Sequence, residues 1–325
     1  MNIAFRVDSS SKTVVGHLMR CLTLADELKP KNYQITFICR DLKGNHIHSV
    51  QYPVFALPKS ESFSSDDLYL EHLGATQQED AEQTIQVLPR NIDVLIVDSY
   101  ALNIIWHKKL RPYVKKILVI DDLANRQFDC DILLNQNVDS KKEDYKKKVP
   151  YDCKLLLGCD YALLKPGFSL LRKKAIEKRK VTKKIKNILI SLGGSDLNNV
   201  TYDVLRQVSD KYNVIVVLGR NSPHNEMIKS YSKNKEIKVI IETKNMPKLI
   251  FEADLGIGAG GSSSWERCCL GLPTLLYITA ENQRVSAGNL EHLGLVKIVR
   301  NLKDDLQNMS NDINSWREMS EKSIA

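Results

Sequence analysis

A glycine-rich segment followed by serines has the composition of a phosphate-binding turn. Residues 258–266 read GAGGSSSWE and follow the apolar run 255–257, at a point where a turn enters a helix. Free backbone N–H groups and the dipole at a helix start bind anions. The segment is neither a Walker A loop nor a Rossmann fingerprint, so it predicts a phosphate site of another type. The candidate phosphate-binding residues are Gly260, Gly261, Ser262 and Ser263.

Glu266 follows this turn and has two alternative roles. It stands three residues after Ser263, the spacing of a capping box, in which the carboxylate reaches back to the start of the helix. Alternatively, the carboxylate accepts hydrogen bonds from the hydroxyl groups of a ribose. The spacing alone leaves both roles open.

A second loop places His17 at the start of the first expected helix. The positive end of a helix disfavours imidazolium, and a general base that works near neutral pH must be a neutral imidazole. A histidine at this position can also cap the helix or bind a ligand without catalysing a reaction. Arg6, Asp8 and Arg20 form either a structural ion pair or a group that orients a sugar or holds His17.

Two further loops follow apolar strands and carry small or amide side chains. Gly193 and Gly194 let backbone N–H groups approach an anion closely, although a Gly-Gly pair also ends ordinary strands. Asn282 and Gln283 lie at another expected helix start, where amide groups either hydrogen-bond a sugar or uracil or cap the helix.

Apolar strands that alternate with helices position these four loops. Strands are expected at residues 3–7, 34–39, 94–97, 117–120 and 155–157, and then at 188–192, 214–218, 239–241, 255–257 and 274–277. In the second half, helices are expected at 199–211, 224–232, 246–252, 264–270 and 283–293. This alternation predicts an α/β protein with two Rossmann-like parallel-sheet domains facing a cleft, at which the loops meet. The domains are expected at 1–164 and 187–325, joined by a basic linker at 165–186.

The composition of the 325-residue chain excludes several classes of protein. The net charge of +8 is concentrated in lysine-rich segments with few aromatic residues, which favours solvated surface over a nucleic-acid interface. The seven cysteines include no C-x-x-C pair, so reduced thiols are expected rather than zinc sites or disulfides. With no signal peptide and no long apolar run, we expect a cytoplasmic monomer without membrane or nucleic-acid partners.

The motifs together resemble those of the UDP-2,4-diacetamido-2,4,6-trideoxy-β-L-altropyranose hydrolases of pseudaminic acid biosynthesis. The similarity runs from about residue 3 to about residue 300 and is specific in combination. The matching segments are 5–10 (FRVDSS) with 16–21 (GHLMRC), 121–126 (DDLANR), 129–131, 134–137, 157–158, 161–164, 191–196 (SLGGSD), 258–273 and 280–283.

The resemblance implies a glycosyltransferase-B type fold and specific residue roles. It implies that His17 is the catalytic histidine and that Tyr100 is a tyrosine close to it. It also implies that Asn199, Glu266 and Asn282 bind substrate, with Glu266 toward the ribose. One departure is Val14, which stands where the family has a glycine before the histidine, so the shape of this loop is expected to differ.

These roles predict an inverting hydrolase that needs neither metal nor cofactor. Neutral His17 would take a proton from water as the water attacks the anomeric carbon and UDP leaves. Backbone N–H groups of the glycine-rich turn would stabilise the charge on the leaving phosphate. The free sugar would serve pseudaminic acid synthesis, for flagellin glycosylation or a surface polysaccharide.

Two alternatives share the same loops. A glycosyltransferase of this fold would pass the sugar from a UDP-amino sugar to an acceptor hydroxyl instead of water. A non-catalytic protein would bind the nucleotide sugar without turnover. Turnover in the absence of an acceptor separates the three.

Overall fold

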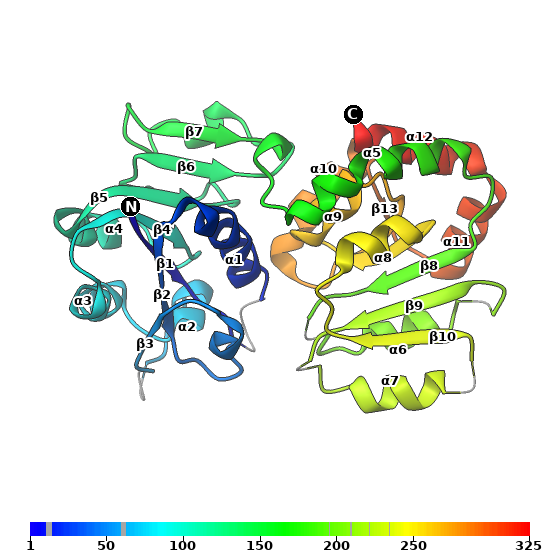
Figure 1. Cartoon of the computed structure of the whole chain (residues 1–325), viewed down its shortest axis with the longest axis horizontal. Helices are drawn as coiled ribbons and strands as arrows, with labels where there is room; N and C mark the ends of the chain where they lie inside the picture. Colours follow the sequence, from blue (N-terminus) through cyan, green and yellow to red (C-terminus); the bar gives the residue numbers. More distant parts are fainter. Residues whose placement is uncertain (11–14, 60–62, 195, 209, 221, 234) are drawn as a thin grey trace. The chain divides into compact units, whose positions relative to one another are not determined.

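The computed structural model describes all residues except 11–14, 60–62, 195, 209, 221 and 234, and it leaves out the side chain of Asn282. The chain divides into two compact units, Met1–Leu163 (unit 1) and Leu164–Ala325 (unit 2). Each unit is built on one parallel sheet with helices packed against it (Figure 1). The prediction of two parallel-sheet α/β domains is confirmed. None of the helices in the described segments is long and apolar enough to cross a membrane.

The sheet of unit 1 has seven strands in the order β3-β2-β1-β4-β5-β6-β7. Its central strands are apolar and buried, as expected where helices cover both faces of a parallel sheet. The bounds are β1 (Asn2–Val7), β2 (Gln34–Arg40), β3 (Val54–Leu57), β4 (Ile92–Asp98), β5 (Val114–Ile120), β6 (Ile132–Asn135) and β7 (Lys154–Leu157).

Four α-helices of unit 1 connect these strands: α1 (Gly16–Leu28), α2 (Leu68–Leu73), α3 (Gln77–Val87) and α4 (Ile104–Leu110). Leu18, Cys21 and Ala25 share one face of α1 and pack into the core with Phe5 and Phe37 of the sheet. This packing fixes α1 against the end of β1 and thereby determines where its first turn presents His17.

The sheet of unit 2 has six strands in the order β10-β9-β8-β11-β12-β13. Its core contains the apolar residues of β8, β9 and β11. The bounds are β8 (Asn187–Ser191), β9 (Asn213–Leu218), β10 (Ile237–Ile241), β11 (Leu255–Ala259), β12 (Thr274–Tyr277) and β13 (Lys297–Ile298). The helices are α5 (Pro166–Val181), α6 (Val200–Leu205), α7 (Asn225–Ser232), α8 (Met246–Glu252), α9 (Ser263–Cys269), α10 (Arg284–His292), α11 (Leu302–Asn311) and α12 (Ile313–Ile324).

The basic segment expected to be a linker is mostly a helix of unit 2. Phe168 and Ala175 of α5 are buried in its core. Arg172 donates hydrogen bonds to the carbonyl oxygens of Cys269 and Ile324, at 2.6 and 2.7 Å. Part of the basic charge in α5 therefore satisfies carbonyl groups at helix ends, a structural role that composition does not distinguish from solvated surface.

The last helix, α12, lies beside α5 and is tied to the segments around α9 (Figure 1). Trp316 donates its indole N–H to the carbonyl of Asp254 at 2.8 Å. The hydroxyl of Ser320 donates to the carbonyl of Gly271, just beyond α9, at 2.7 Å. These contacts hold α9 from the side opposite to its first turn.

Each sheet reverses its strand order at one place, between β1 and β4 in unit 1 and between β8 and β11 in unit 2. Ligands of open parallel sheets bind outside the carboxyl ends of strands at such a reversal. Most loops that carry the predicted site residues follow these four strands, and the loop with Asn282 and Gln283 follows β12, the neighbour of β11. The fold therefore gathers the candidate residues of each unit at its own switch point.

The turn at Gly193 and Gly194 packs directly against Gly219, which provides a test of the fold. A Cβ atom on Gly219 would lie 1.8 Å from the carbonyl oxygen of Gly194, so we expect Gly219→Ala to destabilise the protein by about 1–3 kcal/mol or more. Gly288 in α10 is the matched control. No atom lies within 4 Å of its added Cβ, so Gly288→Ala should stabilise the protein by roughly 0.5–1 kcal/mol.

Thermal or urea denaturation of both variants measures these changes. Equal stability of Gly219→Ala and the parent protein would contradict the close packing of the two loops.

Candidate active site

His17 lies beside an aspartate that the sequence analysis did not select. Its Nδ1 is 2.7 Å from Oδ1 of Asp98, the last residue of β4. Arg20, one turn further along α1, donates to both carboxylate oxygens of Asp98, at 2.6 and 2.7 Å. Because β1 and β4 are paired neighbours, the start of α1 and the end of β4 meet. The result is a buried histidine–aspartate pair.

The charges around Asp98 determine which nitrogen of His17 is available as a base. Burial alone would raise the pKa of the Asp98 carboxyl, but the charges of Arg20 and His17 lower it well below its usual range. An ionised carboxylate at 2.7 Å assigns the proton to Nδ1, which donates to Asp98. In neutral His17 the other nitrogen, Nε2, then carries the lone pair.

Tyr100 completes this cluster. Its ring packs edge-on against the imidazole of His17, with the ring centres 4.6 Å apart. The carboxylate of Asp122 lies near its hydroxyl and accepts a hydrogen bond from Arg20 at 2.9 Å. Burial raises the pKa of Tyr100 well above its usual value, so this hydroxyl stays protonated near neutral pH. Tyr100 is thus placed to orient groups beside His17.

A small pocket opens beside His17. Its volume is about 40 Å³, which is room for about one or two water molecules. Tyr69 and His72 from α2 line it, and the ring centre of Tyr69 is 5.2 Å from that of Tyr100. The remaining lining residues are Asp8, Leu73 and residues 98–101.

Arg6 and Asp8 belong to a buried ion-pair network. Arg6 is fully buried and donates to Asp8 at 2.6 Å and to Asp80 of α3 at 2.5 Å. Burial alone would lower the pKa of Arg6, but Asp8 and Asp80 hold it above its ordinary value. Arg40 also pairs with Asp80, at 2.7 Å. This geometry favours the structural alternative for Arg6. Asp8 lines the pocket, and its buried Oδ2 has no hydrogen-bond partner among the described residues.

The glycine-rich turn of unit 2 differs from the predicted phosphate cradle at one residue. The N–H of Gly260 donates to the carbonyl of Tyr277 at 3.1 Å and so belongs to the sheet. Among the residues that the structure describes, the N–H groups of Gly261, Ser262 and Ser263 have no backbone acceptor. Gly261 has φ of +102°, a conformation that glycine adopts without strain. Three residues, rather than four, thus offer N–H groups to an anion.

Glu266 does not form the capping box that its spacing suggested. The helix begins at Ser263 with Ser262 as its N-cap residue, and no side chain caps it. Burial raises the pKa of the Glu266 carboxyl to about 7, although the charges of Arg267 and Lys165 oppose the shift. No hydrogen bond or ion pair engages this carboxylate within the described part of the chain. A partly buried carboxylate of this kind is free to accept hydrogen bonds from a ligand.

The remaining candidates of unit 2 lie at neighbouring loops. Gly193 has φ of +102°, and Asn199, which precedes α6, has φ of 54° and a buried Oδ1 without a partner. Gln283 packs its side chain against the α-carbon of Gly260, and its Oε1 accepts from the N–H of Thr279 at 3.0 Å. The structure therefore brings Gln283 to the glycine-rich turn.

Three predicted features fall outside the described parts. Val14 and Ser195 are not described, and nothing is described of the Asn282 side chain beyond its place in the short helix Glu281–Gln283. Among the described residues, no group of three His, Cys, Asp or Glu side chains is placed to hold a metal ion.

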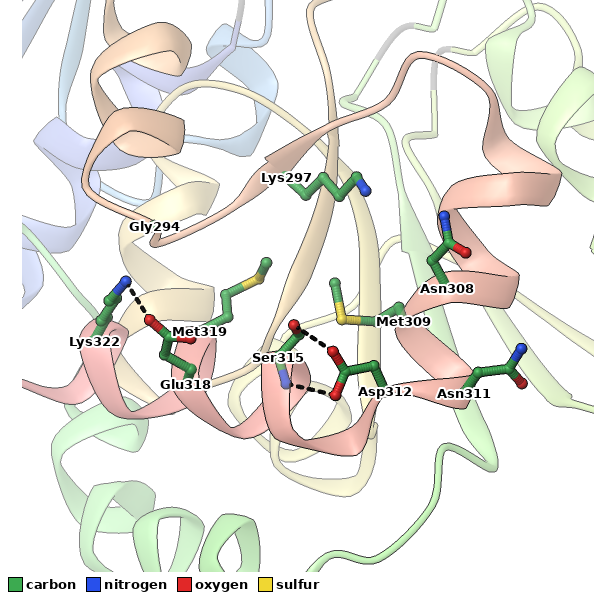
Figure 2. Close-up of a pocket in the computed structure, with 10 residues that line it drawn as sticks. All are labelled: Gly294, Lys297, Asn308, Met309, Asn311, Asp312, Ser315, Glu318, Met319 and Lys322. Atoms are coloured by element: carbon green, nitrogen blue, oxygen red, sulfur yellow. Dashed lines mark hydrogen bonds and ion pairs between the residues drawn. The ribbon is translucent and has the colours of Figure 1, made fainter.

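Another hollow, of about 530 Å³, is lined by residues between Gly294 and Lys322 of unit 2. Figure 2 shows it between α11, α12 and the segment from Gly294 to Lys297, with Met309 and Met319 among its lining. Local pairs such as Lys322 with Glu318 form its rim (Figure 2). None of the predicted site residues lines it.

Known proteins resemble both the sequence and the fold. Residues 187–324 match the Glycosyltransferase family 28 C-terminal domain. The chain is 29% identical over 257 residues to the UDP-2,4-diacetamido-2,4,6-trideoxy-β-L-altropyranose hydrolase of Campylobacter jejuni, covering 78% of this chain and 83% of that protein. The resemblance to this hydrolase family is confirmed.

Two further matches extend the comparison. The chain is 26% identical over 297 residues to the spore coat polysaccharide biosynthesis protein SpsG of Bacillus subtilis, covering 88% of this chain and 80% of that protein. The crystal structure of MurG from Acinetobacter baumannii superposes with a TM-score of 0.62 at 14% identity, covering 99% of this chain and 94% of that one. The fold is of the glycosyltransferase-B type.

The raised pKa of Glu266 gives a prediction that needs no ligand. The folded protein holds this proton more tightly than the unfolded chain, because the pKa rises from 4.5 to about 7 on folding. The stabilisation of the folded protein by this bound proton is therefore complete below about pH 4.5 and is lost as the pH rises through 7. We expect Glu266→Gln to melt at a higher temperature than the parent protein at pH 8, with the difference shrinking or reversing at pH 5.

Glu291 of α10 is the matched control, because hydrogen bonds from Arg300 lower the pKa of its carboxyl. Glu291→Gln should therefore lower the melting temperature at pH 8. If Glu266→Gln destabilises the protein equally at both pH values, Glu266 has a structural role instead.

Proposed function

We propose that the chain hydrolyses the anomeric C1–O bond of a UDP-linked 2,4-diacetamido-2,4,6-trideoxy sugar. UDP and the free sugar are the products, and the free sugar serves pseudaminic acid synthesis. The observation that carries this proposal is the buried pair of His17 and Asp98 beside a pocket of about 40 Å³. The name of the Campylobacter jejuni relative supports the same reaction and sugar.

In this mechanism His17 acts as the general base. Asp98 accepts a hydrogen bond from the Nδ1–H of His17 and so holds the tautomer whose Nε2 lone pair is available to the attacking water. Nε2 takes a proton from water while the water oxygen attacks C1 from the side opposite to UDP. The C1–O bond breaks, the electron pair stays on the β-phosphate, and the configuration at C1 is inverted.

Arg20 and Asp98 prepare His17 for this step. As the imidazole gains its proton, the ionised Asp98 stabilises the new positive charge. Arg20 keeps that carboxylate ionised and fixes its orientation through two hydrogen bonds. Tyr100 limits the movement of the imidazole by edge-on packing and serves to orient the sugar or the water.

Unit 2 binds the nucleotide in this proposal. The free N–H groups of Gly261, Ser262 and Ser263 bind the diphosphate and stabilise the charge that develops as UDP leaves. Glu266 accepts hydrogen bonds from the ribose hydroxyls. Gly193, Gly194, Asn199, Asn282 and Gln283 supply further contacts to the nucleotide sugar. Because these N–H groups stabilise the negative charge on the leaving phosphate, the reaction is proposed to proceed without a metal ion.

A glycosyltransferase remains the alternative, and the match to a glycosyltransferase family 28 C-terminal domain supports it. Both reactions require the same donor site in unit 2. The name of the Campylobacter jejuni relative favours hydrolysis over transfer.

The decisive experiment incubates the protein with the UDP-diacetamido sugar in ¹⁸O-labelled water without an acceptor. We expect UDP release, with the label in the C1 hydroxyl of the sugar. His17→Ala and His17→Asn should cut turnover by a factor of about 10²–10⁴, because neither side chain accepts the proton from water. UDP affinity should stay close to that of the parent protein.

Label on the phosphate would mean that water attacks phosphorus, and the proposed role of His17 would be wrong. Release that requires an added acceptor would identify a transferase. Binding without release under either condition would identify a nucleotide-sugar-binding protein.

Asp98 provides a second test, through the tautomer of His17. In Asp98→Asn the amide can donate its N–H to Nδ1, which moves the imidazole proton to Nε2 and removes the lone pair from the reaction side. We expect turnover to fall by about 10²–10⁴, comparable with losses of an orienting aspartate in other enzymes. UDP affinity, measured by calorimetry, should change little and serves as the control for folding of unit 2. Normal turnover in Asp98→Asn would exclude the orienting role.

A further inference from the structure

Arg267, the residue after Glu266, is buried beneath the glycine-rich turn. Only 4% of its surface is exposed. Its guanidinium donates to the carbonyl of Ala259 at 2.7 Å and to the hydroxyls of Ser263 and Ser264, each at 3.2 Å. These acceptors flank the segment that carries the free N–H groups of Gly261, Ser262 and Ser263. Arg267 thus supports both ends of the turn.

The glycines of β11 make room for this guanidinium. A Cβ atom on Gly258 would lie 2.5 Å from Nη1 of Arg267, and one on Gly256 would lie 3.2 Å from its Cδ. Both glycines lie within the strand and have no positive φ. Space for Arg267, rather than backbone conformation, therefore accounts for glycine at position 258, whereas at position 256 Thr274 and Leu272 are as close as Arg267.

The charge of Arg267 lacks a compensating ion pair. Arg6, Arg20 and Arg40, the buried arginines of unit 1, each contact at least one carboxylate. No carboxylate lies within ion-pair distance of Arg267 in the described part of the chain, and its Nε has no hydrogen-bond partner. The neighbouring Glu266 carboxyl has a pKa of about 7, so it is only partly ionised near neutral pH.

A buried positive charge without an ionic partner costs free energy unless a bound anion pairs with it. The bonding pattern shows where such an anion would bind. Because Ser263 accepts a hydrogen bond from Arg267, the proton of its own hydroxyl is left to point elsewhere. The partly exposed Ser263 therefore presents a hydroxyl donor beside the free N–H groups.

We propose that Arg267 is a positioning residue for the diphosphate. It holds the turn and the Ser263 hydroxyl in the binding geometry, and the negative charge of the diphosphate compensates the positive charge of its guanidinium. This inference rests on the proposed binding of a UDP-sugar. Arg267 acts through the turn and through its electric field, without touching the reacting atoms. Its contribution is specific to the phosphate groups and does not extend to the uridine.

The test compares the affinities for uridine and UDP in Arg267→Met and Arg267→Lys. Arg267→Met should weaken UDP binding by about 10- to 100-fold, the usual range for loss of charge-assisted hydrogen bonding, and uridine binding by less than about threefold. Arg267→Lys keeps the charge but loses the planar fork, so it should recover part of the UDP affinity. Without ligand, Arg267→Lys should melt close to the parent protein.

Arg179 of α5 is the matched control. It is equally buried in unit 2 and likewise forms no ion pair among the described residues, but its Nε, Nη1 and Nη2 all donate to carbonyl oxygens, such as those of Ile250 and Leu270, which gives it a structural role. Arg179→Met should lower the melting temperature and leave the ratio of UDP to uridine affinity unchanged.

The possible outcomes separate this inference from the proposed function. If the parent protein binds no UDP, the proposed function and this inference both fail. If the parent protein binds UDP but the Arg267 variants lose UDP and uridine affinity in equal proportion, or lose neither, Arg267 only supports the fold. In that case the inference is overturned and the proposed function stands.

Discussion

Parallel pairing of β1 with β4 and of β8 with β11 is the constraint on which both candidate sites depend. Parallel neighbours end at the same edge of the sheet, so the loops that follow them must meet there. In unit 1 this pairing joins a histidine at a helix start to an aspartate at a strand end, 81 residues further along the chain. In unit 2 it places two glycine-rich turns at neighbouring strand ends.

The two units handle buried charge in different ways. Unit 1 pairs its arginines with carboxylates, and the network through Asp80 and Asp98 stiffens the surroundings of His17. Unit 2 keeps Arg267 without such a pair and holds Glu266 at a raised pKa. A rigid, neutralised network suits a group that must keep one orientation during proton transfer. A buried arginine whose charge is not compensated by a carboxylate suits a surface that binds a negatively charged ligand.

The central strands of both sheets could be predicted from the sequence because they are long apolar runs. The short strands β3, β6 and β13 were missed, since so few residues give weak periodicity, and the helices α11 and α12 beyond residue 301 were missed as well. Motif spacing located His17 and the glycine-rich turn. The partnership of His17 with Asp98, the burial of Arg6 and the absence of a capping box at Glu266 depend on tertiary packing, which local patterns do not encode.

The attachment of α12 has a consequence for work with this chain. Ser320 and Trp316 brace the segments on either side of α9, and the backbone of Ile324 accepts a hydrogen bond from Arg172. Helix α12 therefore acts as a mechanical support for α9, which starts at the glycine-rich turn. An affinity tag joined directly to Ala325 would strain this support, whereas a flexible spacer would leave it undisturbed.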